Sequence, residues 1–280
     1  MAIKIVCDST CDIDKAWTEA NGVIITPLKV MFGTEEYADG VTLSKEQYYA
    51  KLSDGKVLPT TSQVTPSEFS DIFSRILAAG DEVLSISLAS ALSGTYQSAV
   101  FAKNALGSDR IYLFDSHAAT CSLALVVRIA VQLRDAGLPA AEILARLESL
   151  RPKVRLCICL DTLRFLKLGG RLPASSAFIG ELLNIKPILT LDEGKVVIME
   201  KKRSLPKAFE WMAAKIKATG LNPEYPVCFG HSNSPQGLAA MAGYLSDNGV
   251  ALPDPLTVII GAVISTHTGP GAVGLAYIEQ

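Results

Sequence analysis

The sequence predicts an α/β fold of two α/β domains, the first an α/β/α layered, mostly parallel sheet and the second a mixed-sheet α/β sandwich. Three observations support this prediction. The chain has 280 residues, and domains commonly hold ~100–200 residues, so two compact domains are expected. Apolar strand-like runs alternate with helical patterns along the chain. In the second half, two alternating runs flank a tight turn, which is typical of an antiparallel hairpin.

Six apolar runs give the strand signal. Because helical patterns separate them, they indicate helices packed on a mostly parallel sheet. The runs are "IKIVC" at 3–7, "EVLSISL" at 82–88, "RIYLFDS" at 110–116, "RLCICL" at 155–160, "YPVCFG" at 225–230 and "LTVIIGAV" at 256–263.

One helix is predicted with both of its ends. In "TPSEFSDIFSRILAAG", at 65–80, Thr65 is placed to cap the helix, Pro66 takes its first position, and Glu68 completes a capping box. Gly80 ends the pattern, as glycine commonly does at a helix C-terminus.

The second half of the chain begins a different architecture. "IKPILTLDEGKVVIMEKKRS", at 185–204, holds two alternating runs around Asp-Glu-Gly and is predicted as a β-hairpin. A helical pattern ends just before Pro152. We therefore place an N-terminal α/β domain at 1–152 and a C-terminal mixed α/β domain at 153–280.

Composition excludes some classes of partner. The net charge of −2 supplies no basic field of the kind that gathers nucleic acid, so no nucleic-acid partner is expected. Hydrophobic residues make up 49% of the chain, charged residues only 19%, and the mean hydropathy is +0.30. This apolar excess can line an apolar ligand site or form a buried subunit interface.

The sequence favours a cytoplasmic protein. The most lipid-like run, 122–133, is interrupted by Arg128 and is shorter than the ~20 apolar residues of a spanning helix, so no integral membrane segment is expected. The first ten residues lack the apolar core of a signal peptide. The six cysteines form no C-x-x-C pair and are interpreted as reduced, mostly buried side chains: Cys7, Cys11, Cys121, Cys157, Cys159 and Cys228.

Two short motifs resemble known sites but lack their context. "GPGAVG", at 269–274, fits G-x-G-x-x-G, yet the six residues after Gly274 leave no room for the helix of a dinucleotide fold. "GHSNS", at 230–234, nearly spells a nucleophile elbow, but Ser234 replaces the final glycine. The second motif is more simply a loop that ends in a helix cap.

Hydroxyl-rich segments are the first candidates for a binding site. Thr61 and Ser62 precede the helix at 65–80, while Ser93 and Gly94 lie where another helix is expected to start. Either cluster alone is most often a capping loop. Both follow or flank strand ends, where open α/β sheets bind ligands, and a helix N-terminus with nearby hydroxyl groups suits a phosphate or carboxylate.

A third candidate is the segment "ISTHTGPGAVG" at 264–274. His267 and Thr268 stand there before Gly-Pro-Gly, and glycines let backbone approach a ligand closely. A lone histidine is more often structural. Arg171 follows a glycine pair and Arg203 ends a basic run, for which spacing alone favours a solvated basic face.

The sequence contains no motif typical of nucleotide binding or metal binding. It shows no Walker A sequence, no kinase glycine-rich loop and no cluster of acidic metal ligands. We therefore expect no cofactor, no metal and no ATP-dependent activity of the protein alone.

Seven short motifs follow one another along the chain: "CDST" at 7–10, "TTSQ" at 60–63, "SGTYQSA" at 93–99, "LGGR" at 168–171, "LLNIKPIL" at 182–189, "KKRS" at 201–204 and "HTGPGAVG" at 267–274. Taken in order, they resemble the DegV family of bacterial fatty-acid-binding proteins over nearly the whole chain. One departure is "DSHAATCS" at 115–122, where the family usually has a glycine after Asp-Ser.

The resemblance implies a specific function. A long-chain fatty acid lies between the domains, and its carboxylate at their junction is presented to a separate fatty acid kinase subunit that uses ATP to form an acyl-phosphate. The chain is then a lipid-binding carrier, not an enzyme. By motif position, Thr61 and Ser93 bind the carboxylate, and Arg171 and Arg203 face the partner or the added phosphate without touching the buried chain. The surrounding residues are Ser62, Gly94, His267 and Thr268.

Two alternatives remain open. One is a hydrolase of an ester or acyl-phosphate that uses Ser93 or Ser232 as nucleophile with His267 as base. The other is a regulatory or scaffold protein with an incidental cavity. Loss of turnover with retained binding in Ser93→Ala distinguishes the hydrolase from a carrier.

Overall fold

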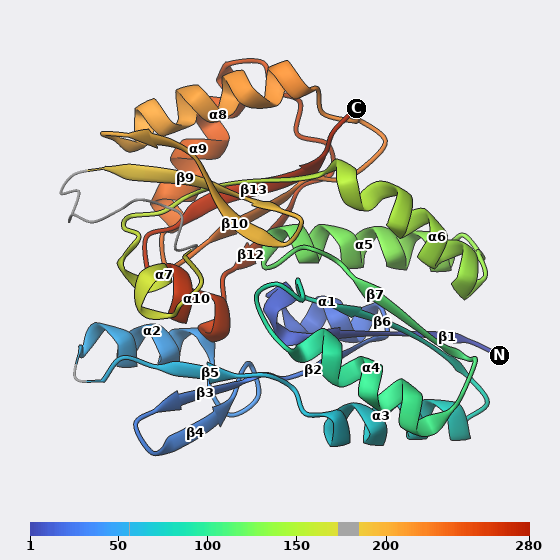
Figure 1. Ribbon diagram of the computed structural model, residues 1–280. Coiled ribbons are helices and arrows are strands. Elements are labelled where there is room, and N and C mark those ends of the chain that lie inside the picture. Colours follow the sequence, from blue (N-terminus) through green and yellow to red (C-terminus); the bar gives the residue numbers. More distant parts are fainter. Residues whose placement is uncertain (56, 173–184) are drawn as a thin grey trace.

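The computed structural model describes residues 1–55, 57–172 and 185–280. It confirms the predicted α/β fold, with a parallel sheet in the N-terminal part and a mixed sheet in the C-terminal part. Figure 1 shows the layers: one pair of helices, the parallel sheet, a middle layer of helices, the mixed sheet and a second pair of helices. In these described ranges no helix is both long and apolar enough to span a membrane.

The four-stranded parallel sheet has the order β2-β1-β6-β7. Helices α3 and α4 cover one face, α5 and α6 cover the other, and α1 packs beside β2 (Figure 1). The strands are β1 (Ile3–Asp8), β2 (Val23–Thr26), β6 (Glu82–Ser87) and β7 (Ile111–Asp115). The helices are α1 (Lys15–Ala20), α3 (Pro66–Ala78), α4 (Thr95–Leu106), α5 (Cys121–Asp135) and α6 (Ala140–Leu150), with a short 3-10 helix η1 (Ser9–Cys11) after β1.

The six-stranded mixed sheet has the order β10-β9-β8-β13-β11-β12. Only β11 and β12 pair in parallel among its described strands. Helices α8 (Leu205–Thr219) and α9 (Pro235–Asp247) cover the face turned away from α5. The strands are β8 (Val154–Cys159), β9 (Lys186–Asp192), β10 (Lys195–Lys202), β11 (Cys228–His231), β12 (Leu256–Ile259) and β13 (Val273–Ile278).

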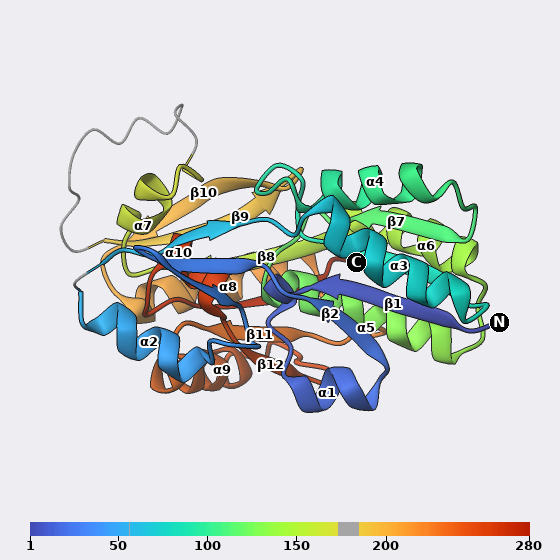
Figure 2. The same cartoon turned by 90° about the horizontal axis from the view of Figure 1, so that it is seen from below.

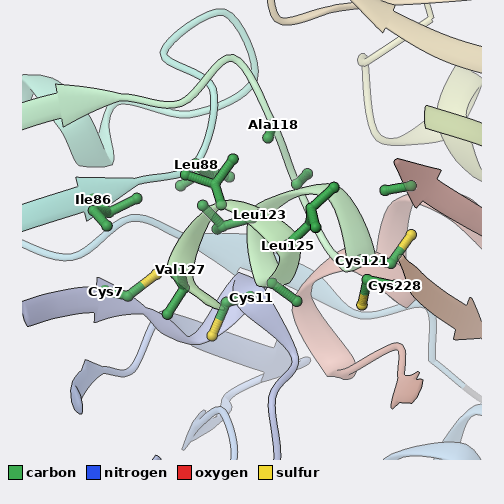
Figure 3. Close-up of a cluster of buried hydrophobic side chains, with 14 of the residues drawn as sticks. Cys7, Cys11, Ile86, Leu88, Ala118, Cys121, Leu123, Leu125, Val127 and Cys228 are labelled. Atoms are coloured by element: carbon green, nitrogen blue, oxygen red, sulfur yellow. The ribbon is translucent and has the colours of Figure 1, made fainter. Parts of the chain in front are cut away.

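Helix α5 is shared by both sheets. From Cys121 to Val131 every side chain except that of Arg128 is buried, because β1 packs on one side of the helix and β11 and β13 on the other. Figure 3 shows Leu123, Leu125 and Val127 of α5 among side chains from both sheets. All six cysteines are buried free thiols, as expected. The apolar excess of the sequence therefore fills this middle layer.

Several local predictions are confirmed. The helix at 65–80 has the predicted capping box, formed by Thr65 and Glu68. The hairpin at 185–204 is β9 and β10, with Glu193 and Gly194 at positive φ in the turn. The chain passes from the parallel to the mixed sheet through the 3-10 helix η2 (Arg151–Lys153). The division into domains at 152 and 153 stays a prediction.

Three predictions need correction. The residues predicted as a hydroxyl-rich loop at 60–62 form β5 (Thr60–Ser62), because β-branched threonines pair readily with a neighbouring strand. The run at 225–230 is a strand only from Cys228, after Pro226. The run at 256–263 ends at Ile259, and Ala262–Thr268 form helix α10, since a short, buried apolar run does not distinguish strand from helix.

One further unit was not predicted from the sequence. Strand β5 belongs to a small antiparallel sheet, β4-β3-β5, and α2 (Lys45–Ser53) lies near it at the end of the molecule away from the N-terminus (Figures 1 and 2). The other strands are β3 (Lys29–Phe32) and β4 (Glu35–Ala38). Helix α10 packs against β3, β5, α2 and the short helix α7 (Arg164–Leu168). This unit therefore joins the two halves of the chain.

Two buried carboxylates hold the N-terminus of α10. Asp12 Oδ1 accepts a 2.8 Å hydrogen bond from the Gly261 backbone, and Asp39 accepts from the backbone of Ala262 and Val263. The other oxygen of Asp12, Oδ2, has no hydrogen-bond partner in the described part of the chain. Burial raises the pKa of Asp12 to about 7, although the nearby Lys45 opposes this shift.

We predict that Asp12→Asn stabilises the protein above about pH 7 but not near pH 4. The raised folded-state pKa means that the contribution of Asp12 to stability is lost as pH rises from about 4 to about 7, whereas asparagine stays neutral. The free energy of unfolding should rise by up to roughly 4 kcal/mol at alkaline pH, since the pKa is raised from about 4 to about 7 and each pH unit corresponds to about 1.4 kcal/mol. Denaturant unfolding across this range measures it, with exposed Asp109→Asn as control. A difference between variant and parent that does not change with pH contradicts the prediction.

Candidate functional site

A cavity of about 350 Å³ lies between the two halves of the chain. All six residues predicted to bind a ligand line it: Thr61, Ser62, Ser93, Gly94, His267 and Thr268. Gln63 and Arg171 also line the cavity near this polar group. The other lining side chains are mainly apolar, and they include Leu88 and Leu92 after β6, Leu156 and Ile158 on β8, and Leu189, Leu191 and Val196 on β9 and β10. The cavity thus joins a polar cluster to an apolar wall.

The polar cluster is built where β5 meets the start of α4. Gly94 is the N-cap residue of α4, and Ser93 Oγ accepts a 3.3 Å hydrogen bond from the backbone of Thr95. A Cβ atom on Gly94 would lie 2.2 Å from the side-chain oxygen of Gln63, so a larger residue there displaces Gln63. The predicted helix start is confirmed, and it points the positive end of α4 at the cavity.

His267 lies in the last turn of α10 and faces Thr61. Its Nε2 is 2.9 Å from Thr61 Oγ1, while its buried Nδ1 has no hydrogen-bond partner in the described residues. Burial, with a smaller effect of the Arg171 charge, lowers the pKa of His267 to about 4, so the ring is neutral at pH 7. A proton on Nδ1 would be an unsatisfied buried donor, so we infer that the proton is on Nε2. Thr61 then accepts from His267 and can donate its own proton into the cavity.

The position of His267 depends on Gly169. Helix α7 ends at Gly169, and a Cβ atom built there would lie only 2.1 Å from His267 Nδ1. The backbone angles of Gly169 are right-handed helical, which any residue can adopt. Glycine is therefore required here because it has no side chain to collide with His267. Gly169 belongs to the motif "LGGR" at 168–171, but no local pattern in the sequence indicates its contact with His267.

The two arginines have different surroundings. Arg171 lines the cavity, with Nε donating to the Leu92 carbonyl at 3.2 Å and Nη1 to the Gly169 carbonyl at 2.6 Å. Arg203 is exposed just after β10 and is not among the cavity-lining residues. Arg171 therefore lies on the cavity wall, which its spacing in the sequence did not indicate. The expectation that neither arginine touches the buried acyl chain stays a prediction.

The geometry does not assemble a hydrolase from the predicted residues. Ser232 is fully buried, with its Oγ 3.3 Å from Ser265 Oγ, and Ser93 Oγ contacts Thr95. His267 Nε2 contacts Thr61, and Nδ1 lies against Gly169 without a hydrogen-bond partner among the described residues, so neither ring nitrogen is bonded to Ser93 or Ser232. Within the described ranges, no group of three or more His, Cys, Asp or Glu side chains could hold a metal ion.

The departure from the family pattern lies beside the cavity. In "DSHAATCS", His117 and Thr120 have positive φ values of 52° and 49°, and Thr120 lines the cavity. Positive φ is unusual for a β-branched residue, so this loop is strained. Helix α5 still begins directly after it, fully buried. Of the motif at 182–189, residues 182–184 lie outside the described residues.

We predict that Gly169→Ala displaces His267 while the fold stays intact. The new methyl group takes the space beside Nδ1 and pushes the ring away from Thr61. NMR titration should find the imidazole pKa moved from about 4 toward its ordinary value. Gly243→Ala on α9, which meets nothing within 4 Å, is the matched control. An unchanged His267 titration in Gly169→Ala overturns the prediction.

Comparison with known proteins finds matches over nearly the whole chain. A sequence model of one protein family, described as an uncharacterised protein of the DegV family, matches residues 2–280 of the chain. A DegV domain-containing protein of Caldanaerobacter subterraneus subsp. tengcongensis is 34% identical over 285 residues, covering 99% of each chain. A fatty-acid-binding DegV family protein from Thermus thermophilus has a TM-score of 0.91 at 33% identity over 100% of both chains. A stearic-acid-binding protein from Eubacterium ventriosum has a TM-score of 0.90 at 26% identity, covering 100% of this chain and 98% of that one. The chain belongs to the DegV family.

Proposed function

We propose that the protein binds a long-chain fatty acid in the cavity and presents its carboxylate to a separate ATP-dependent kinase, which forms the acyl-phosphate. The observation that carries the first part is a cavity with hydrogen-bond donors clustered in one region and an apolar wall elsewhere. Fatty acid binding by the DegV family protein of Thermus thermophilus and stearic acid binding by the Eubacterium ventriosum protein support it. We propose a cytoplasmic location for this carrier.

The two ends of a fatty acid match the two parts of the cavity. Each methylene group moved from water to the apolar wall contributes ~0.8 kcal/mol. An ionised carboxylate loses hydration on burial and needs several donors to offset that cost. The hydroxyl groups of Thr61 and Ser93, the N-terminus of α4 and the Arg171 guanidinium supply them. Among the described lining residues no side chain is acidic, so nothing there repels the carboxylate.

Each polar residue has a distinct part in this proposal. His267 donates to Thr61 and so orients the threonine hydroxyl toward the carboxylate. Ser93 binds the second carboxylate oxygen beside the helix N-terminus. Ser62, Gly94 and Thr268 shape the surrounding wall. Holding the carboxylate in one orientation is the protein's contribution to phosphoryl transfer, which depends mainly on positioning.

The kinase supplies the nucleotide chemistry in this proposal. The carrier itself performs no catalytic step. Arg203, exposed at the end of β10, contacts the partner, whereas Arg171 on the cavity wall meets the added phosphate. A guanidinium is well suited to a phosphate because its fork of donors matches the phosphate oxygens.

We predict that Thr61→Val weakens fatty acid binding by about tenfold or more, since a hydrogen bond to a charged group contributes ~1.5–3 kcal/mol. Thr60→Val is the matched control, because Thr60 is exposed on the same strand and does not line the cavity. Binding is measured by calorimetry on delipidated protein, and native mass spectrometry of the protein as purified identifies the resident acid. Protein that carries no fatty acid and binds none when it is added refutes the proposed function.

We predict that charge reversal separates the two arginines. Arg203→Glu should reduce kinase-dependent acyl-phosphate formation several-fold and leave fatty acid affinity within about twofold. Arg171→Glu should impair both, because its side chain lines the cavity. Arg75→Glu, on the exposed side of α3, is the control. Assays with the purified kinase and ATP measure the product. Equal loss of binding in both variants places Arg203 in the site as well and contradicts its assignment to the partner.

A further inference from the structure

Strands β8 and β9 separate partway along the mixed sheet. They pair only at Ile158 with Leu189 and at Cys159 with Ile188. Strand β8 begins four residues before Ile158, at Val154, and this first part of the strand pairs only with β13. Strand β9 continues to Asp192, and its last part pairs only with β10. We call the gap between 154–157 of β8 and 190–192 of β9 the β8/β9 seam.

The seam separates the binding cavity from a second hollow. This recess of about 690 Å³ lies around the start of β8 and the end of β9. Leu156, Thr190 and Leu191 line both the cavity and the recess, so they form the partition between them. The recess is polar: its charged side chains include Arg151 and Arg155 on one side and Asp192 and Glu193 on the other.

The direction of β8 places the seam away from the carboxylate-binding residues. After Cys159, at the paired end of the strand, the chain continues through α7 to Gly169, which touches His267. Leu156 lies three residues before Cys159, and a strand advances ~3.3 Å per residue. An acyl chain that starts at His267 and follows the apolar wall along Ile158 and Leu189 therefore runs toward the seam.

We propose that the methyl end of the fatty acid lies at the β8/β9 seam and that Leu156, Thr190 and Leu191 determine the longest acyl chain that is bound. This inference rests on the proposed function and adds a determinant of chain length to it. Within the cavity, each added methylene group strengthens binding by about fourfold. A tail that passes the partition enters a polar recess, where further methylene groups gain little.

The test uses delipidated protein and a homologous series of straight-chain saturated fatty acids, from medium to very long. Thr190→Phe fills the seam and should weaken binding of the longest acids by about fifteenfold, the loss of roughly two methylene groups at about fourfold each. Medium-chain acids should bind as before. Leu156→Ala opens the partition and should move the strongest binding to longer acids. Thr257→Phe, at an exposed position of β12 that lines neither the cavity nor the recess, is the control.

The outcomes distinguish this inference from the proposed function. If the parent protein binds no acid of any length, the proposed function fails and the inference fails with it. If the parent binds fatty acids but Thr190→Phe changes all affinities by the same factor, only the placement of the tail is wrong. Leu156 belongs to the buried core, so Thr190→Phe, at a half-buried position, provides the decisive result if Leu156→Ala does not fold.

Discussion

The burial of α5 between two sheets is the constraint on which the rest of this structure depends. A helix that is apolar around its whole circumference cannot lie on a surface, so it needs a layer on each side. The parallel sheet supplies one layer and the mixed sheet the other. Arg128 is the exception within the buried stretch, and it reaches Asp254 at the edge of the structure. Because the cavity opens beside the first turn of α5, lined by Ala119 and Thr120, the same packing that unites the two halves also creates the binding site.

Helix α10 couples the site to the rest of the fold at a cost in electrostatic energy. Its N-terminus is held by Asp12 and Asp39 from the first part of the chain, while its last turn carries His267. Burying two carboxylates near each other is unfavourable, as the raised pKa of both groups indicates. In return, a short helix from the second half is fixed against the small sheet that carries Thr61. His267 is thereby held in place by the carboxylates at the N-terminus of α10 and by Thr61 at its last turn.

The sequence predicted features that depend on local chemistry and missed those that depend on tertiary contacts. The capping box at Thr65 and the turn at Gly194 follow from neighbouring residues, and both predictions are confirmed. The first two residues of helix α10, Ala262 and Val263, were predicted as the end of a strand, because burial on all sides removes the period that distinguishes strand from helix. The hydroxyl residues of the site were found through their motifs. The apolar wall and the contact between Gly169 and His267 were not, since no local pattern shows which distant side chains meet.

The charges in the cavity suit the proposed carrier, whose ligand would gain charge on phosphorylation. A neutral His267, with a pKa of about 4, contributes hydrogen bonding without a fixed charge over the physiological pH range. Arg171 is the only Lys or Arg among the described lining residues, and its donors already contact two backbone carbonyls. In the proposed function the acyl-phosphate carries more negative charge than the carboxylate, so Arg171 and the N-terminus of α4 would mainly stabilise it. The apolar wall would contact the same acyl chain before and after phosphorylation. On this proposal, affinity for the acyl chain and response to the head group are separate properties, set by different elements of one cavity.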